Sequence, residues 1–579
     1  MKVLALLLLT AIGYWLAYRT YGQYLARKIF KINAQNVVPS VELADGKEYV
    51  SSTKSVMFGH HFTSIAGTGP IVGPAIGVIW GWGPALIWVF FGSIFMGAVH
   101  DFSTLIISMR HQGKSISDIA GYYINPRVRF MFFVIVFLAL LIVIAIFGLV
   151  IALIFARFPQ SVVALWLEIP IAIGFGYMAL KSGRHIGWWT AFSVLLLYIM
   201  IGVGVLFPVT LSGFSWLPAT GLWTIILLVY AFIASVLPVD FLLQPRDYLN
   251  AWQLYIAMGL ILLGIIGTSF MSELTMSAPA FNFFPEGAPS MLPFLFITVA
   301  CGAISGFHSL VCSGTSSKQI ASEADAPLIG YGSMVLEGFL ATVIIIAVTA
   351  GISLSYQVNG EELTGLAAWQ AHYGSWSASA GLGSKLDAVV IGCANLMKVL
   401  HIPLDLAIAV VGVFIASFAG TTLDSATRVQ RYIIAELVSY TPFKSYNNKW
   451  LATTIAVVSA AALAFSSGLD GKGALSLWPL FGAVNQLLGS LALLVATIYL
   501  LKLGGKKWLL TGLPCMVLMG ITSWASLLNQ IHFFQAQQWL LVMINGVILV
   551  LSLVMIVEAI LVMITGGRVL GTPGRLGRL

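Results

Sequence analysis

The chain has little charge for its length. Its 579 residues include only 29 Lys and Arg and 21 Asp and Glu, so 9% are charged, against roughly 25% in a typical soluble domain. This shortage excludes a soluble globule. Hydrophobic residues make up 59%, and apolar runs of about 20 residues, the length of a helix that crosses a bilayer, recur from one end to the other. The composition predicts an all-α polytopic membrane protein.

Further absences narrow the class. Runs such as residues 130–155 lack the alternation of apolar and polar residues found in membrane-spanning strands, so the backbone must close its hydrogen bonds within helices. No GxxxxGK[ST] loop is present, which excludes self-contained ATP-driven transport. The chain has four cysteines, Cys301, Cys312, Cys393 and Cys515. Their spacing is not that of metal ligands, which argues against a zinc site or a disulfide scaffold. We expect no cofactor and no bound metal.

About fifteen spans are expected, and the basic residues orient them. The spans begin near residues 3, 56, 84, 130, 161, 187, 222, 251, 292, 328, 402, 450, 478, 508 and 535. With Met1 outside, most of the 29 Lys and Arg lie in cytoplasmic loops, as the positive-inside rule requires, and the C-terminus is also cytoplasmic. The exceptions are Lys2, Arg157, Lys385, Lys398 and Lys472. The net charge of +8 is therefore assigned to orientation rather than to a nucleic-acid partner.

Two regions depart from a simple span pattern. The apolar start of the chain is followed by no small-residue cleavage site, so we expect a retained anchor helix. Residues 356–400 form the longest outside connection, and 386–400 within it has the pattern of an amphipathic or re-entrant segment.

The most informative segment is residues 58–77, FGHHFTSIAGTGPIVGPAIG. Its prolines lack amide donors and its glycines lower helix propensity, so we expect a broken helix with free backbone groups around residues 66–70. In transporters with inverted repeats such breaks carry the substrate and ion sites. The alternative is that Gly and Pro merely allow close helix packing. The candidate substrate ligands in this segment are Thr63, Ser64, Gly67, Thr68 and Gly69.

His60 and His61 are adjacent, hence about 100° apart on a helix, so they cannot both face one partner. One of them could relay protons, because the unperturbed pKa of histidine lies near physiological pH. The alternative is a histidine bonded to a neighbouring carbonyl near the cytoplasmic interface. Metal binding by this pair alone is not expected, since zinc sites need three or four protein ligands.

Two further polar breaks are expected, at residues 304–317 and 417–431. The first, ISGFHSLVCSGTSS, has hydroxyls that could coordinate a small cation or donate to a carboxylate, although small residues packing between helices would give the same pattern. Its candidates are His308 and the substrate ligands Ser313, Thr315 and Ser316. In the second, Asp424 and Arg428 stand four apart on one helix face, which predicts either a surface salt bridge or a coupling or gating pair.

Other ionisable residues lie within apolar runs and are functional candidates on that ground. Asp101 and Glu337 rank highest because small residues surround them, as at interior-facing positions. Arg246 is expected at the cytoplasmic face as a gate or anchor, and Asp240 lies nearby in an apolar run. The complete set of coupling or gating candidates is His60, His61, Asp101, Asp240, Arg246, His308, Glu337, Asp424 and Arg428.

Five strings of the sequence together resemble the carbon starvation (CstA) family. They are FGHHFTSIAGTGPIVGPAIG, LPVDFLLQPRDYL, ISGFHSLVCSGTSSKQI, FAGTTLDSATRVQRYI and LWPLFGAVNQLLG, in order from about residue 55 to 500. The resemblance implies an inner-membrane transporter induced on nutrient starvation, linked to uptake of peptides or to proton-coupled uptake of pyruvate. It also implies a core of five plus five inverted repeats like that of amino acid, polyamine and organocation transporters.

The expected organisation follows that resemblance. Residues 1–55 form an extra helix and a cytoplasmic loop, 56–450 the transport core with repeats at about 56–210 and 222–450, and 451–579 additional helices. The spans at 56 and 222 have opposite orientations, as inverted repeats require.

The leading hypothesis is secondary import of a small organic anion, most of all pyruvate, coupled to protons or, less favoured, to sodium. Amides at Gly67 to Gly69 would receive the carboxylate at a half-helix end, and Asp101, Glu337 or His61 would carry the proton. The alternative is a peptide importer; a channel and an intramembrane enzyme are more remote, and no HExxH or GxSxG motif supports the enzyme. The partners are a small-molecule substrate and the bilayer, and the oligomeric state stays open.

Overall fold

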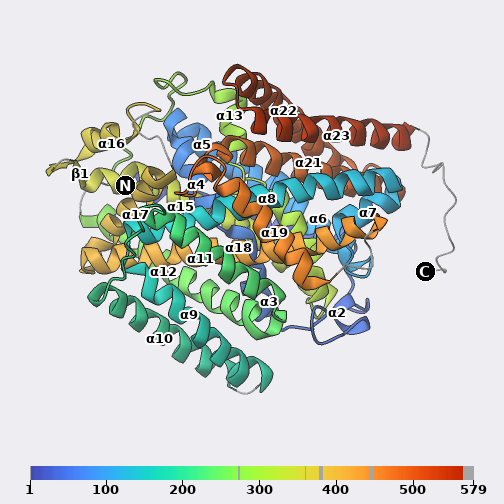
Figure 1. Ribbon diagram of the computed structural model, residues 1–579, viewed down its shortest axis with the longest axis horizontal. Coiled ribbons are helices and arrows are strands. Elements are labelled where there is room, and N and C mark those ends of the chain that lie inside the picture. Colours follow the sequence, from blue (N-terminus) through green and yellow to red (C-terminus); the bar gives the residue numbers. More distant parts are fainter. Residues whose placement is uncertain are drawn as a thin grey trace.

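The computed structural model describes residues 2–183, 185–271, 274–358, 360–376, 382–442 and 448–564. Nearly all of these residues lie in helices or short connections (Figure 1). The helices up to residue 206 are α1 Lys2–Ala17, α2 Pro39–Glu42, α3 Lys54–Ala66, α4 Gly69–Gly77, α5 Trp82–Gly92, α6 Ala98–Met109, α7 Ile116–Tyr123, α8 Pro126–Arg157, α9 Ser161–Phe175 and α10 Ile186–Leu206.

The second half of the chain continues the helical pattern. Its helices are α11 Ala219–Val236, α12 Gln244–Met271, α13 Met291–Thr298, α14 Gly306–Gly314, α15 Ser333–Ile346, α16 Gly365–Tyr373, α17 Leu382–Met397, α18 Leu404–Ser439, α19 Lys449–Ala464, α20 Gly473–Ser476, α21 Trp478–Lys502, α22 Leu509–Gln535 and α23 Trp539–Ile564. The two short strands β1 (Tyr356–Val358) and β2 (Glu361–Leu363) pair antiparallel, with Tyr356 opposite Leu363.

The protein is an all-α polytopic membrane protein. Twelve helical segments among the described residues are long and apolar enough to cross a membrane, and α3 with the helix that follows it makes thirteen if this bent pair is one span. The short helix α19 and the interrupted pair α13–α14 begin where two more spans were expected. The count of about fifteen stays a prediction, as do the boundaries of the two repeats.

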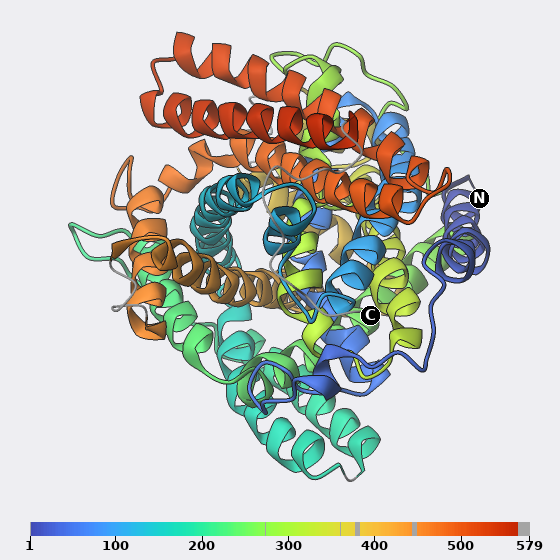
Figure 2. The same ribbon diagram turned by 90° about the vertical axis from the view of Figure 1, so that its right-hand side faces the viewer.

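Burial sorts the helices into a centre and a periphery. The apolar windows of α8, α18 and α21 are more than four-fifths buried, which explains why α8 is apolar on every face. In Figure 1, α22 and α23 lie along one edge and the α9–α10 hairpin along the opposite edge. Figure 2, turned by 90°, shows α8 end-on between these two edges. Polar groups on the central helices are therefore surrounded by other helices rather than by lipid.

The first expected break is confirmed. Helix α3 ends at Ala66, α4 begins at Gly69, and the pair is bent by 41°. Gly67 has φ 46° and ψ −151°, a conformation open essentially only to glycine. A Cβ at Gly67 would also overlap the Oγ1 of Thr422, so α18 passes directly beside the break.

A second interruption lies between α13 and α14, where residues 299–305 are not helical. The predicted break at residues 304–317 overlaps it only at residues 304 and 305, because most of that string forms the helix α14. The third expected break is wrong: α18 runs as one helix through residues 417–431. This stretch has small and hydroxyl residues but no proline, and a single glycine does not stop a helix that is packed on all sides.

Candidate functional site

The start of α4, directly after the first break, meets the second break at one wall of a large cavity of about 820 Å³. Gly69 and Gly73 of α4 line it together with Thr298, the last residue of α13, and Cys301 of the second break. The helices touch closely here, because a Cβ on Gly73 would lie 2.7 Å from the carbonyl oxygen of Thr298 and one on Gly69 would overlap Cys301. The cavity therefore lies where the first turns of α4 meet the non-helical segment after α13.

Most of the predicted substrate ligands do not reach this cavity. Of the eight, Gly69 alone is among the residues that line it. The hydroxyls of Thr63 and Ser64 turn toward α12, where Ser64 donates to an Asp247 carboxylate oxygen at 3.3 Å. Ser313 accepts from the amide of Ile116 at 3.0 Å. The remaining residues of the set are Gly67 and Thr68 in the first break and Thr315 and Ser316 just beyond α14.

A chain of buried ionisable groups lies behind the second break. His100 and Asp101 come from α6, His308 from α14 and Glu337 from α15, and all four side chains are inaccessible. The Nδ1 atoms of His100 and His308 donate to the two oxygens of Asp101 at 2.7 and 2.8 Å. These bonds fix both imidazoles and leave the Nε2 of His308 facing a Glu337 oxygen at 3.4 Å.

Glu337 ends this chain without a strong partner. Neither of its carboxyl oxygens has a hydrogen bond among the described residues, and neither does the Nε2 of His308. A buried carboxyl group beside a single imidazole can hold or pass a proton at little structural cost, because no ion pair has to break. The arrangement can therefore move a proton between α15, α14 and α6.

A second polar network surrounds Arg246 on α12. Its guanidinium bonds to Asp424 of α18 and to the Tyr230 hydroxyl of α11, and Tyr230 donates to Asp424 at 2.9 Å. Oxygens of Glu168 and Asp247 each lie 3.5 Å from guanidinium nitrogens. One cation thus faces three carboxyl groups from three helices, and it is only 3% exposed.

This geometry corrects one expectation. Arg246 is buried among its carboxyl partners, and its role as a gate or anchor at the cytoplasmic face stays a prediction. Asp424 does not pair with Arg428: Asp424 bonds to Arg246, and Arg428 donates to the carbonyl of Leu237. The spacing of Asp424 and Arg428 places them on one helix face, but groups from other helices bind each of them instead. Asp240 is exposed and belongs to neither network.

The two histidines of α3 have different partners, as their adjacency predicted. The Nδ1 of His60 donates to Asp247 at 2.7 Å, which connects α3 to the Arg246 network. The Nδ1 of His61 lies 2.7 Å from the Ser316 hydroxyl. Both Nε2 atoms are buried without a hydrogen bond among the described residues.

Sequence reasoning missed the charged residue of the cavity. Lys385 of α17 lines the same cavity as Gly69 and Cys301, with Trp376 beside it. The available signal was that Lys385 is one of few basic residues expected outside, directly before the segment of amphipathic pattern at residues 386–400. All four cysteines are buried and free, as expected of packing residues.

The polytopic fold, the paired breaks and the buried ionisable chain can now be compared with known proteins. A sequence profile described as "Carbon starvation protein CstA" matches residues 2–525. The chain belongs to the CstA family. It is 33% identical to "Peptide transporter CstA" of Helicobacter pylori (strain ATCC 700392 / 26695), over 91% of this chain and 82% of that protein.

Two other family members have informative names. The chain is 33% identical to "Peptide transporter CstA" of Bacillus subtilis (strain 168), over 88% of this chain and 87% of the relative. It is 30% identical to "Pyruvate/proton symporter BtsT" of Escherichia coli (strain K12), over 88% of this chain and 79% of the relative. Among solved structures, that of MhsT in complex with L-phenylalanine matches with a TM-score of 0.46 and 13% identity, over 89% of this chain and 99% of that one.

Proposed function

We propose that this CstA-family member imports a small organic carboxylate, most of all pyruvate, together with protons across the inner membrane during carbon starvation. The N-terminus is outside and the C-terminus cytoplasmic, in keeping with the distribution of basic residues. The observation that carries the proposal is the cavity at which both helix breaks meet, with the buried His–Asp–His–Glu chain directly behind it.

The cavity favours an anion over a zwitterion. No aspartate or glutamate is among the residues that line it, so no carboxylate from the described residues receives a peptide amine there. Backbone amides at the start of α4 favour a carboxylate, because a helix N-terminus has a partial positive charge. Glu337, which the peptide hypothesis needed as the amine partner, does not line the cavity and faces His308 Nε2 at 3.4 Å.

The proton path rests on the same geometry. His308 lies on α14, immediately after the second break, so any movement of that break on substrate binding changes the 3.4 Å separation between His308 and Glu337. Proton transfer and alternating access are thereby linked through one short helix. The Arg246 network supplies a fixed cation near the first break.

Peptide import is the second candidate, because several relatives are named peptide transporters and about 820 Å³ accommodates more than a pyruvate molecule. The test is uptake of radiolabelled pyruvate by purified protein in proteoliposomes, with proton and sodium gradients imposed separately. Accumulation driven by the proton gradient alone supports the proposal. Uptake of a labelled dipeptide with no pyruvate uptake under either gradient would overturn it.

A further inference from the structure

Lys385 is a buried cation that has no counterion among the described residues. It is only 4% exposed, and its Nζ has no hydrogen bond or ion pair among the described residues. The nearest acid along its own helix, Asp387, is paired with Arg157 instead. Burying an ammonium group without a partner is costly. A buried lysine that lines a cavity is therefore suited to bind an anion that enters the cavity.

Aromatic rings position this lysine. Its Nζ lies 5.0 Å from the centre of the Tyr373 ring and 5.9 Å from that of Trp376, within cation–π range. Hydrogen bonds hold both aromatic residues in place. The Tyr373 hydroxyl donates to the carbonyl of Ala75 on α4 at 2.7 Å, and the backbone N–H of Trp376 donates to the carbonyl of Glu286 at 2.8 Å. The ammonium is thus held in place before any ligand binds.

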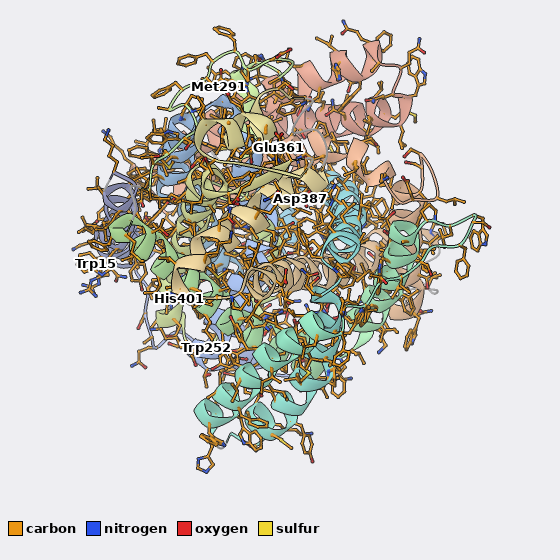
Figure 3. All side chains as sticks on the ribbon, turned by 90° about the vertical axis from the view of Figure 1, so that its left-hand side faces the viewer. Trp15, Trp252, Met291, Glu361, Asp387 and His401 are labelled. Atoms are coloured by element: carbon orange, nitrogen blue, oxygen red, sulfur yellow. The ribbon has the colours of Figure 1, made fainter. Side chains whose placement is uncertain are left out.

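The surroundings of Lys385 suit an anion. The polar side chains that line the cavity with it are neutral donors or acceptors, such as Ser290, Thr298 and Asn529, and His532 is also present. The cavity is continuous from Lys385 to Gly69 and exceeds the volume that one small carboxylate needs. Figure 3 shows Asp387, and hence α17, in the middle of one end of the molecule, the end that also carries Glu361.

We propose that Lys385, with Tyr373 and Trp376, forms an outer anion subsite that captures the carboxylate of the transported organic acid before it reaches the helix breaks. The subsite rests on the proposed function for the identity of its anion. Its existence as an anion site rests on the unpaired ammonium and the cavity alone.

The titration of the site agrees with this role. Burial lowers the pKa of Lys385 to about 7, so arrival of a carboxylate would restore the charged form. Its titratable neighbours on α16 stay neutral near that pH: burial and Lys385 lower the pKa of His372 to about 3, and burial raises that of Tyr373. Neither His372 nor Tyr373 therefore competes with an external anion for the charge of Lys385.

The first test measures the KM and kcat of pyruvate uptake in proteoliposomes driven by a proton gradient. Lys385→Met should raise KM by about tenfold, the worth of one charged hydrogen bond, and leave kcat nearly unchanged. Lys385→Arg should retain most of the affinity because it keeps the charge. The matched control is Lys398→Met, since Lys398 follows the same helix but is exposed and does not line the cavity. A KM for Lys385→Met within twofold of the wild type would overturn the inference.

A second measurement works whether or not pyruvate is transported. Acetylation of Lys385 in the purified protein is followed by mass spectrometry, with pyruvate, acetate, inorganic phosphate or the uncharged ester methyl pyruvate present. Protection by pyruvate but not by methyl pyruvate supports the subsite. Protection by another anion, in a protein that takes up no pyruvate, keeps the anion site and refutes the proposed substrate. Absence of protection by every anion refutes the subsite itself.

Discussion

Replacing Gly69 by alanine tests whether contact between the two helix breaks matters for transport. The added Cβ would overlap the Cβ and Sγ of Cys301, whereas the next atom, the Cα of Cys301, would be an acceptable 3.8 Å away. Overpacking of this kind costs about 1–3 kcal/mol. If the transport cycle needs the breaks in contact, this cost lowers the population of that state by about 5- to 150-fold.

A second substitution at the same contact should restore transport. Cys301→Gly removes both overlapping atoms, so the double variant Gly69→Ala/Cys301→Gly should recover most of the uptake that Gly69→Ala loses. Gly420→Ala on α18 is the matched control, because nothing lies within 4 Å of its added Cβ. The assay is pyruvate uptake per reconstituted protein. Normal uptake by Gly69→Ala, or a loss that Cys301→Gly does not relieve, would refute the reasoning.

Three further outcomes are expected. Arg246→Met should destabilise the protein by about 3–5 kcal/mol, because it leaves buried carboxyl groups without their cation. Arg129→Met removes two partly exposed ion pairs and should cost at most about 1 kcal/mol for each. Thermal unfolding in detergent compares the two variants, and equal melting temperatures would contradict the burial argument. Glu337→Gln should abolish proton-driven accumulation but preserve pyruvate exchange between equal concentrations, and retained accumulation would exclude Glu337 as the proton carrier. Because burial lowers the pKa of Lys385 to about 7, the side chain is charged below that pH and neutral above it. The affinity of the wild type for pyruvate should therefore fall as the outside pH rises through 7. The same fall in Lys385→Met would contradict this assignment.

Local sequence signals predicted the membrane class and the first break. A proline removes a donor and a glycine permits positive φ wherever the chain places them, so the interruption at Gly67 follows from its immediate neighbours. The adjacency of His60 and His61 similarly required different partners. Long apolar runs require helices in lipid irrespective of how those helices pack.

Only the tertiary structure decided which charges meet. Arg246 and Asp424 are 178 residues apart, and the spacing that suggested Asp424 with Arg428 describes one helix without its neighbours. That Lys385 has no partner among the described residues likewise depends on every helix packed around it, since an acid from any of them would have formed an ion pair with it. Helix breaks arise from covalent geometry at a few consecutive residues, whereas the pairing of buried charges depends on side chains that distant helices bring together.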